Sequence, residues 1–275
     1  GRTLVVTDID NTLLAMSQDL GSEAWFQWQN KLLREGTRAT ESGDLVANDF
    51  DELLRIHKLL FSLSSMHATD FRNSSTILLL QSMGYPVIAM TSRSFDIQDV
   101  TFRELRKNHY SFLHSAIGPK CGYAGTYYPY QLGPVLREAS SGAPHEAERF
   151  YLNDSQMKRW GLSQAKKVSY QNGVLFGDGQ HKGVLLLSLL AKTEFHPCAV
   201  VFIDDSLKNI ENMHDAFSTT GIPITLIRYS FMDDANQKFW NLDKTEVKNQ
   251  WSRLRSTLDS IFSPSTTGDG HRSIE

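Results

Sequence analysis

Two aspartates one residue apart, Asp8 and Asp10, stand directly after a short apolar run near the start of the chain. A carboxylate can attack phosphorus to form an acyl phosphate, and a second carboxylate can protonate the leaving oxygen and later deprotonate water. Two carboxylates that face a phosphate also call for a hard divalent cation such as Mg²⁺, which prefers oxygen ligands. An isolated Asp-x-Asp is more often a plain acidic turn, so the pair needs support from elsewhere in the chain.

A hydroxyl pair follows the second apolar run, at residues 87–90. This run predicts a buried strand that ends at Thr91 and Ser92. A hydroxyl at this place can hydrogen-bond a phosphoryl group; Thr91 is the first choice, and Ser92 is the alternative by one register. Arg93 could touch an anionic substrate, although a solvated surface arginine is the commoner case.

A lysine at the head of a helix can offset the negative charge of a carboxylate and a phosphate, and the helix N-terminus itself favours anions. Lys182 has this place at the start of the apolar helical pattern 182–192. Lys166 and Lys167 are alternatives, but they precede a predicted hairpin.

An acidic pair, Asp204 and Asp205, ends the third apolar run at residues 199–203. Carboxylates in this position can supply metal ligands. Asp205 is the first choice for direct ligation and Asp204 for a water-mediated contact, with the reverse assignment open. Asn209, one turn into the next predicted helix, could support the same site.

Residues 8–13, Asp-Ile-Asp-Asn-Thr-Leu, resemble the first motif of the haloacid dehalogenase (HAD) superfamily. This resemblance implies that Asp8 is the nucleophile and that Asp10 is the general acid/base, whose carbonyl also binds the metal. Aspartate at position 10 points to phosphatases and phosphomutases, because the dehalogenase and P-type ATPase branches carry other residues there.

The later motifs of the superfamily match in the same order along the chain. The resemblance assigns Thr91 and Lys182 to catalysis and phosphoryl binding, with Ser92 as a further phosphate contact. It assigns Mg²⁺ to the carboxylate-bearing residues Asp8, Asp10, Asp205 and Asp204. Segments 20–26 and 172–183 also resemble a bacterial HAD subfamily without an assigned substrate, which implies a helical cap.

Apolar runs that alternate with helical patterns predict an α/β fold, and the resemblance makes it a HAD-type, Rossmann-like, doubly wound and mostly parallel sheet with an inserted helical cap. The polar residues above follow strand ends, where ligands bind in such sheets. We expect a core at 1–20 plus 74–262, a helical cap at 21–73 and a disordered tail at 263–275. A loop-rich insertion is expected at about 116–165, and whether it forms a second cap is left open.

Periodicity and end signals predict the remaining elements. Helical spacing extends from about Gly21 to Phe71, and the Asn172-Gly173 pair between apolar flanks predicts a hairpin. Further helices are expected at 74–83, 97–108, from 206 to about 217 and from about 243, and a further strand at 225–229.

The composition is that of an ordinary globular protein, with 275 residues and a net charge of −3. Without a basic excess, neither nucleic acid nor an anionic membrane is expected as the main partner. The longest apolar stretch, 184–191, is too short to span a bilayer. Two cysteines are too few for a disulfide framework, and the scattered histidines form no zinc pattern.

The chain begins two residues before a strand pattern, with Gly1-Arg2. A natural protein rarely starts so close to its first core strand, so a preceding segment, an export signal included, stays open. We therefore leave the choice between a cytoplasmic and an exported protein open.

These features predict a Mg²⁺-dependent phosphomonoesterase that acts on a small phosphorylated molecule through an aspartyl phosphate. A phosphotransferase or phosphomutase that uses the same intermediate is the first alternative, and a non-catalytic binding protein on a HAD scaffold is the second. The identity of the substrate and the oligomeric state are left open.

Overall fold

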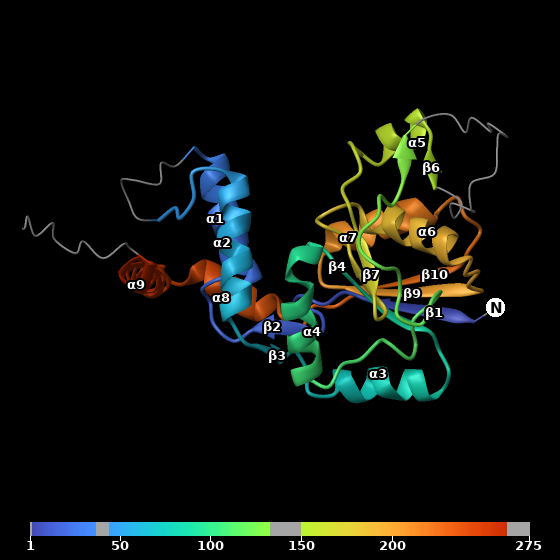
Figure 1. Ribbon diagram of the computed structural model, residues 1–275, viewed down its shortest axis with the longest axis horizontal. Helices are drawn as coiled ribbons and strands as arrows, with labels where there is room; N and C mark the ends of the chain where they lie inside the picture. The colour runs from blue at the N-terminus through green and yellow to red at the C-terminus, as the bar shows by residue number, and fades with distance from the viewer. Residues whose placement is uncertain (1, 37–43, 133–149, 263–275) are drawn as a thin grey trace, which may run out of the picture.

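A six-stranded sheet forms the centre of the protein in the computed structural model, which describes residues 2–36, 44–132 and 150–262 (Figure 1). The strand order is β10-β9-β1-β4-β8-β7, and all neighbours are parallel except β7 and β8. The strands are β1 (Thr3–Thr7), β4 (Val87–Thr91), β7 (Ser169–Gln171), β8 (Val174–Phe176), β9 (Ala199–Asp204) and β10 (Ile224–Arg228).

Helices cover both faces of this sheet. The helices α6 (Lys182–Thr193) and α7 (Leu207–Phe217) contribute Leu186 and Phe217 to the apolar cluster on one face. The helices α3 (Asn73–Ser82) and α4 (Gln98–Lys107), the latter preceded by a 3-10 turn at Phe95–Ile97, contribute Ile77 and Leu105 to the other. The predicted doubly wound, mostly parallel α/β fold is therefore confirmed.

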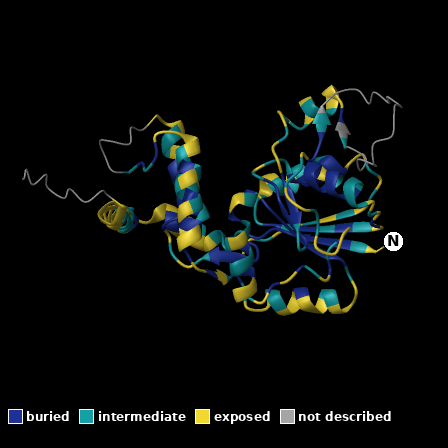
Figure 2. Ribbon diagram, in the orientation of Figure 1, coloured by how far each residue is buried: buried dark blue, intermediate teal, exposed yellow. Residues whose placement is uncertain are grey.

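Burial follows from this layering. The strands β1 and β4 are buried along almost their whole length, as is much of α6, so these elements form the centre of the molecule (Figure 2). Near-continuous apolar runs are what a strand covered on both faces requires, which explains why the sequence pattern predicted these strands correctly.

The helices α6 and α7 approach closely at Gly183. A Cβ atom at this position would lie 2.5 Å from the Ala216 Cβ and 2.6 Å from the Asn212 carbonyl oxygen. Only glycine fits such a contact, because those distances are well inside van der Waals separation. This contact fixes the first turn of α6 against α7.

The predicted hairpin is present as β7 and β8. Asn172 and Gly173 both have positive φ angles, 50° and 76°, as a two-residue type I′ turn requires. The Gly173 position also lies against Phe112, whose carbonyl oxygen would be 2.5 Å from an added Cβ. The turn residues thus satisfy both the local backbone geometry and the packing.

Four helices form a second body, which we call the helical lobe (Figure 1). Its apolar cluster joins Trp25, Leu53 and Leu60 to Phe239 and Val247. The lobe consists of α1 (Glu23–Arg34), α2 (Phe50–Leu63), α8 (Asp233–Asn241) and α9 (Thr245–Phe262).

The helices α8 and α9 differ from the sequence prediction, which assigned residues 74–262 to the core and did not foresee α8. They pack on the lobe because Phe239 and Val247 are buried against its apolar residues. Local periodicity predicts that a helix has an apolar face, but it does not say which distant element covers that face. The division into a core and a cap at residues 21–73 stays a prediction.

The helical pattern predicted from Gly21 to Phe71 is wrong at its end. Residues Met66–Ala68 form the strand β3, which pairs antiparallel with β2 (Leu14–Met16). A strand of three residues is defined by its partner across the chain, which local spacing of apolar residues cannot detect. This small sheet links the segment after α2 to the chain that follows Asp10.

The predicted loop-rich insertion contains few regular elements among its described residues. The short parallel strands β5 (Gln131–Leu132) and β6 (Tyr151–Leu152) are followed by α5 (Asp154–Arg159). Residues 133–149 of the insertion and the predicted tail, 263–275, lie outside the described residues.

His57 lies in an aromatic environment inside the lobe. Its ring centroid is 4.5 Å from that of Phe26 and 4.6 Å from that of Phe61, and its Nε2 is 2.9 Å from the Gly21 carbonyl oxygen. Burial lowers the pKa of His57 to about 4, against an ordinary value of 6.5.

We expect acid to destabilise the protein through His57. The unfolded chain takes up a proton below pH 6.5 while the folded state resists it, so the stability present above pH 6.5 is lost as the pH falls toward 4. Between pH 7 and 4.5 the loss from this group is about 2 kcal/mol. Urea unfolding of the wild type and of His57→Phe at both pH values measures it. Equal losses in the two proteins would rule out this role.

Candidate active site

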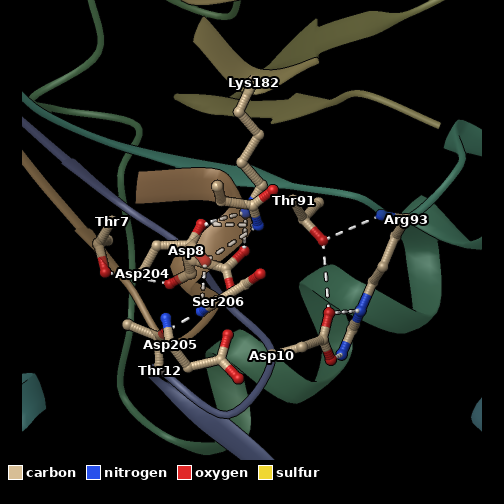
Figure 3. A network of polar contacts seen from close by, with 11 residues as sticks. Thr7, Asp8, Asp10, Thr12, Thr91, Arg93, Lys182, Asp204, Asp205 and Ser206 are labelled. Atoms are coloured by element: carbon tan, nitrogen blue, oxygen red, sulfur yellow. Dashed lines mark hydrogen bonds and ion pairs between the residues drawn. The ribbon is translucent and has the colours of Figure 1, made fainter. Parts of the chain in front are cut away.

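The predicted site residues meet at the carboxyl ends of three adjacent strands (Figure 3). Asp8 follows β1, Thr91 ends β4 and Asp204 ends β9, while Lys182 begins α6. Parallel pairing of β9 and β4 on either side of β1 brings their ends to one edge of the sheet. This edge is where doubly wound sheets bind ligands.

Lys182 binds two buried carboxylates. Its Nζ lies 2.5 Å from the Asp8 Oδ1 and 2.6 Å from the Asp204 Oδ2, and all three side chains are almost inaccessible. Burial raises the pKa of Asp8, an effect that Lys182 opposes and that Asp204 and Asp205 increase. Burial alone would lower the pKa of Lys182, but the two carboxylates outweigh it and raise this pKa. The site therefore holds more negative charge than its lysine balances.

Asp205 lies beside this cluster and is less buried than Asp204. Burial, then Asp204 and the Glu23 carboxylate, raise the pKa of Asp205 to about 7. One carboxylate oxygen each from Asp8, Asp204 and Asp205 can be chosen so that all three lie within 4.8 Å of one another. Three oxygen donors in this arrangement fit a hard cation such as Mg²⁺.

Asp204 is already engaged by protein donors. Besides Lys182, the Ser206 backbone N–H lies 2.9 Å from its Oδ1, and the Asn209 Nδ2 lies 3.0 Å from the same oxygen. The sequence prediction that Asn209 supports the site agrees with this contact. Asp205 is the more accessible of the two aspartates, which favours it for direct metal ligation.

Thr12 connects the loops that follow β1 and β9. Its hydroxyl lies 3.4 Å from the Asp8 Oδ2 and accepts a hydrogen bond of 3.1 Å from the Asp205 backbone N–H. The threonine of the first motif thus fixes the position of one acidic loop relative to the other.

Arg93 corrects a sequence interpretation. The sequence favours a solvated surface arginine over one that touches an anionic substrate, but the Arg93 side chain is only 3% exposed and binds both oxygens of Asp10. The Thr91 hydroxyl is 3.4 Å from the Asp10 Oδ2 and accepts a hydrogen bond from the Arg93 backbone N–H. Thr91 is fully buried, whereas Ser92 is exposed. The local sequence does not show that the Arg93 side chain points inward, because its partner, the Asp10 carboxylate, lies 83 positions earlier in the chain.

A cavity of about 630 Å³ opens over the site. Its floor includes Asp8, Asp10, Lys182 and Asp205, and its walls come from several parts of the chain. They include Ser92, the lobe residues Glu23 and Gln27, the insertion segment 160–164, Gln180, and Lys208, Asn209 and Asn212 of α7.

The sequence indicated Ser92 and Asn209 but not the wall residues of the lobe and the insertion. Glu23 lies in the first turn of α1, where its carboxylate accepts a 3.0 Å hydrogen bond from Gln27, and burial raises its pKa. Trp160 lies in the segment that follows α5. No motif marks either residue, because their place in the wall depends on how the lobe and the insertion fold over the sheet.

The alternative lysines are not part of the acidic cluster. Lys166 lines the cavity, but its Nζ lies 3.7 Å from the Asp178 carboxylate. The Lys167 Nζ lies over the ring of Tyr128, 5.9 Å from its centroid. Of the three lysines considered from sequence, Lys182 is the one placed against Asp8.

The fold and the site define a doubly wound α/β protein with an acidic centre at the carboxyl edge of its sheet. The chain belongs to the DUF2608 family, whose model, described as a protein of unknown function, matches residues 1–262. No curated protein matches the chain. Among the described residues, none of the helices combines the length and the apolar character needed to cross a bilayer.

Solved structures similar to the chain include HAD enzymes. A HAD family enzyme from Bacteroides thetaiotaomicron, in complex with magnesium and inorganic phosphate, is 11% identical. The match covers 82% of this chain and 94% of that one, with a TM-score of 0.35. A haloacid dehalogenase-like family hydrolase from Streptococcus pneumoniae is 14% identical, with 88% and 92% covered and a TM-score of 0.38.

Proposed function

We propose that this protein is a Mg²⁺-dependent, HAD-type phosphatase that hydrolyses a small phosphomonoester through an aspartyl phosphate on Asp8. The observation that carries the proposal is the cluster in which Lys182 bridges Asp8 and Asp204 while Asp205 lies beside them. An excess of carboxylates over one lysine is suited to a divalent cation, whose positive charge would offset that excess and allow an anionic phosphate to approach.

The roles of the residues follow from their contacts. Lys182 holds the Asp8 Oδ1, and the Oδ2, which the Thr12 hydroxyl contacts at 3.4 Å, would be the oxygen that attacks phosphorus. The bond from phosphorus to the leaving oxygen breaks as Asp10 gives that oxygen a proton. Water then attacks phosphorus, Asp10 takes a proton from the water, and the Asp8 carboxylate and phosphate are released. Thr91 and Lys182 contact the phosphoryl group, with Ser92 at the cavity surface as a further contact.

Asp8 and Asp205 would hold the metal, with the Asp10 carbonyl as a further ligand and Asp204 in an indirect role. When bound, Mg²⁺ supplies positive charge that lets the Asp8 carboxylate approach the phosphate. Asp204 is engaged by Lys182, Ser206 and Asn209, which supports its indirect role.

The shape of the cavity supports a small substrate. At about 630 Å³ it lies within the range of small-molecule sites, and the lobe and the insertion both contribute to its walls. Such walls exclude water and restrict access, which favours a small phosphorylated molecule over a phosphorylated protein surface.

We expect hydrolysis of 4-nitrophenyl phosphate with Mg²⁺ and a loss of at least about 100-fold when EDTA removes the metal. Readdition of Mg²⁺ should restore the rate. A panel of phosphorylated metabolites and phosphopeptides, with candidate acceptor alcohols present, then separates free phosphate from transferred phosphate. Transfer without release would establish the phosphotransferase alternative, and no turnover of any member would favour a binding protein.

A further inference from the structure

Arg93 has all its observed polar contacts inside the protein, at the junction of the sheet and the helical lobe. Its Nε lies 2.9 Å from the Asp10 Oδ2 and its Nη2 lies 2.7 Å from the Asp10 Oδ1. Its Nη1 donates to the Thr101 hydroxyl of α4 at 2.9 Å. A buried guanidinium requires a charged partner, and here that partner is Asp10.

The lobe side of the guanidinium is covered by two residues. The Arg93 Cζ lies 4.4 Å from the centroid of the Phe61 ring, at the end of α2, and the Nη2 lies 3.0 Å from the Met66 sulfur in β3. Both contacts exclude water from the ion pair, which strengthens it and fixes the plane of the guanidinium. The orientation of Arg93 therefore depends on where the lobe lies.

Asp10 is correspondingly constrained. The two-point contact holds its carboxylate toward Arg93, on the side away from Lys182 (Figure 3). A planar fork fixes both the direction and the plane of a carboxylate, which a lysine cannot do. Each carboxylate oxygen keeps a second lone pair, so Asp10 can exchange a proton with the leaving oxygen or with water while Arg93 fixes its plane.

We propose that Arg93 is the positioning residue for Asp10, and that the helical lobe sets the position of Arg93 through Phe61 of α2. The contact between Phe61 and Arg93 is thereby linked to the proton transfers of the site. This inference rests on the proposed function, because it concerns the acid/base residue of that reaction.

The first test compares two leaving groups of similar size, 4-nitrophenyl phosphate and benzyl phosphate. The nitrophenolate leaves without a proton, whereas the benzyl alkoxide needs one. In Arg93→Lys we expect kcat for benzyl phosphate to fall about 10- to 100-fold more than kcat for the nitrophenyl ester, with both KM values nearly unchanged. Arg106→Lys, an exposed arginine on α4, is the matched control.

The second test acts from the lobe. In Phe61→Leu we expect the ratio of kcat for benzyl phosphate to kcat for 4-nitrophenyl phosphate to fall as it does in Arg93→Lys, by a smaller factor. Leu53→Ala, a fully buried position on the same helix within the lobe's own cluster, should lower the melting temperature and leave the ratio unchanged. An equal loss on both esters in Arg93→Lys would overturn the positioning role. An unchanged ratio in Phe61→Leu would overturn the link to the lobe.

A third measurement needs no activity. If Arg93 links Phe61 to Asp10, the change in melting temperature of the double variant Phe61→Leu/Asp10→Asn should differ from the sum of the two single changes. This difference should disappear when the same three variants are made in the Arg93→Lys protein. Additive shifts would refute the coupling. A wild type that hydrolyses neither ester would contradict the proposed function, while this cycle would still decide whether Phe61 and Asp10 are linked.

Discussion

Asp8→Asn is expected to abolish hydrolysis, with a loss of kcat on the order of 10³-fold or more. An amide cannot displace an alkoxide or aryloxide from phosphorus, so no aspartyl phosphate forms. The measurement is the Mg²⁺-dependent release of 4-nitrophenol, with Asp19→Asn, an exposed aspartate in the loop before α1, as the matched control.

The same variant should keep its fold and bind a phosphate analogue. Asparagine has the size of aspartate, and Lys182 keeps its second partner, Asp204. Phosphate ligands other than the nucleophile remain in place. Binding of vanadate or phosphate with Mg²⁺, followed by calorimetry, checks this. An Asp8→Asn protein that turns over at the wild-type rate would eliminate the aspartyl-phosphate mechanism.

Lys182→Met should affect both activity and stability strongly. Removing the lysine leaves Asp8 and Asp204 buried without their shared cation, a change that typically costs about 3–5 kcal/mol. Mg²⁺ should recover part of that loss by taking the place of the missing positive charge. Lowering the pH should also reduce this loss of stability, because burial raises the pKa of Asp8 and protonation of its carboxylate removes an unpaired charge.

Urea unfolding with and without Mg²⁺ measures the effect of Lys182→Met. Lys192→Met is the control, since Lys192 lies at the other end of the same helix, over the rings of Tyr123 and Tyr127. A loss of stability that is equal in the two variants, or that Mg²⁺ does not change, would contradict the role of Lys182 in balancing the charge of the site.

Much of the sheet and of the acidic cluster was predictable because it depends on local sequence. The strands at Val87–Thr91 and Ala199–Asp204 are apolar runs with polar ends, and parallel pairing necessarily brings those ends together. Thr91 and Asp204 were predictable for this reason, and Lys182 was predictable from its place at the head of the apolar helical pattern 182–192.

The rest depends on contacts between distant segments. Arg93 was misjudged because a surface arginine and one aimed at Asp10 are identical in local sequence. The strand Met66–Ala68 exists through its pairing with Leu14–Met16, and Phe239 is buried by helices about 200 positions earlier. Glu23 belongs to the cavity only because α1 lies over the sheet edge. Periodicity and motifs hold no information about such docking.

The close contact between α6 and α7 makes a residue with no polar side chain decisive for the chemistry. Gly183 directly follows Lys182, and its neighbours on α7 leave no room for even a methyl group. Any larger residue there would push the start of α6 outward and carry the ammonium group away from Asp8 and Asp204. The space between α6 and α7 therefore limits which substitutions the site can accept. A substitution at Gly183 that alters no charge should lower activity by displacing Lys182.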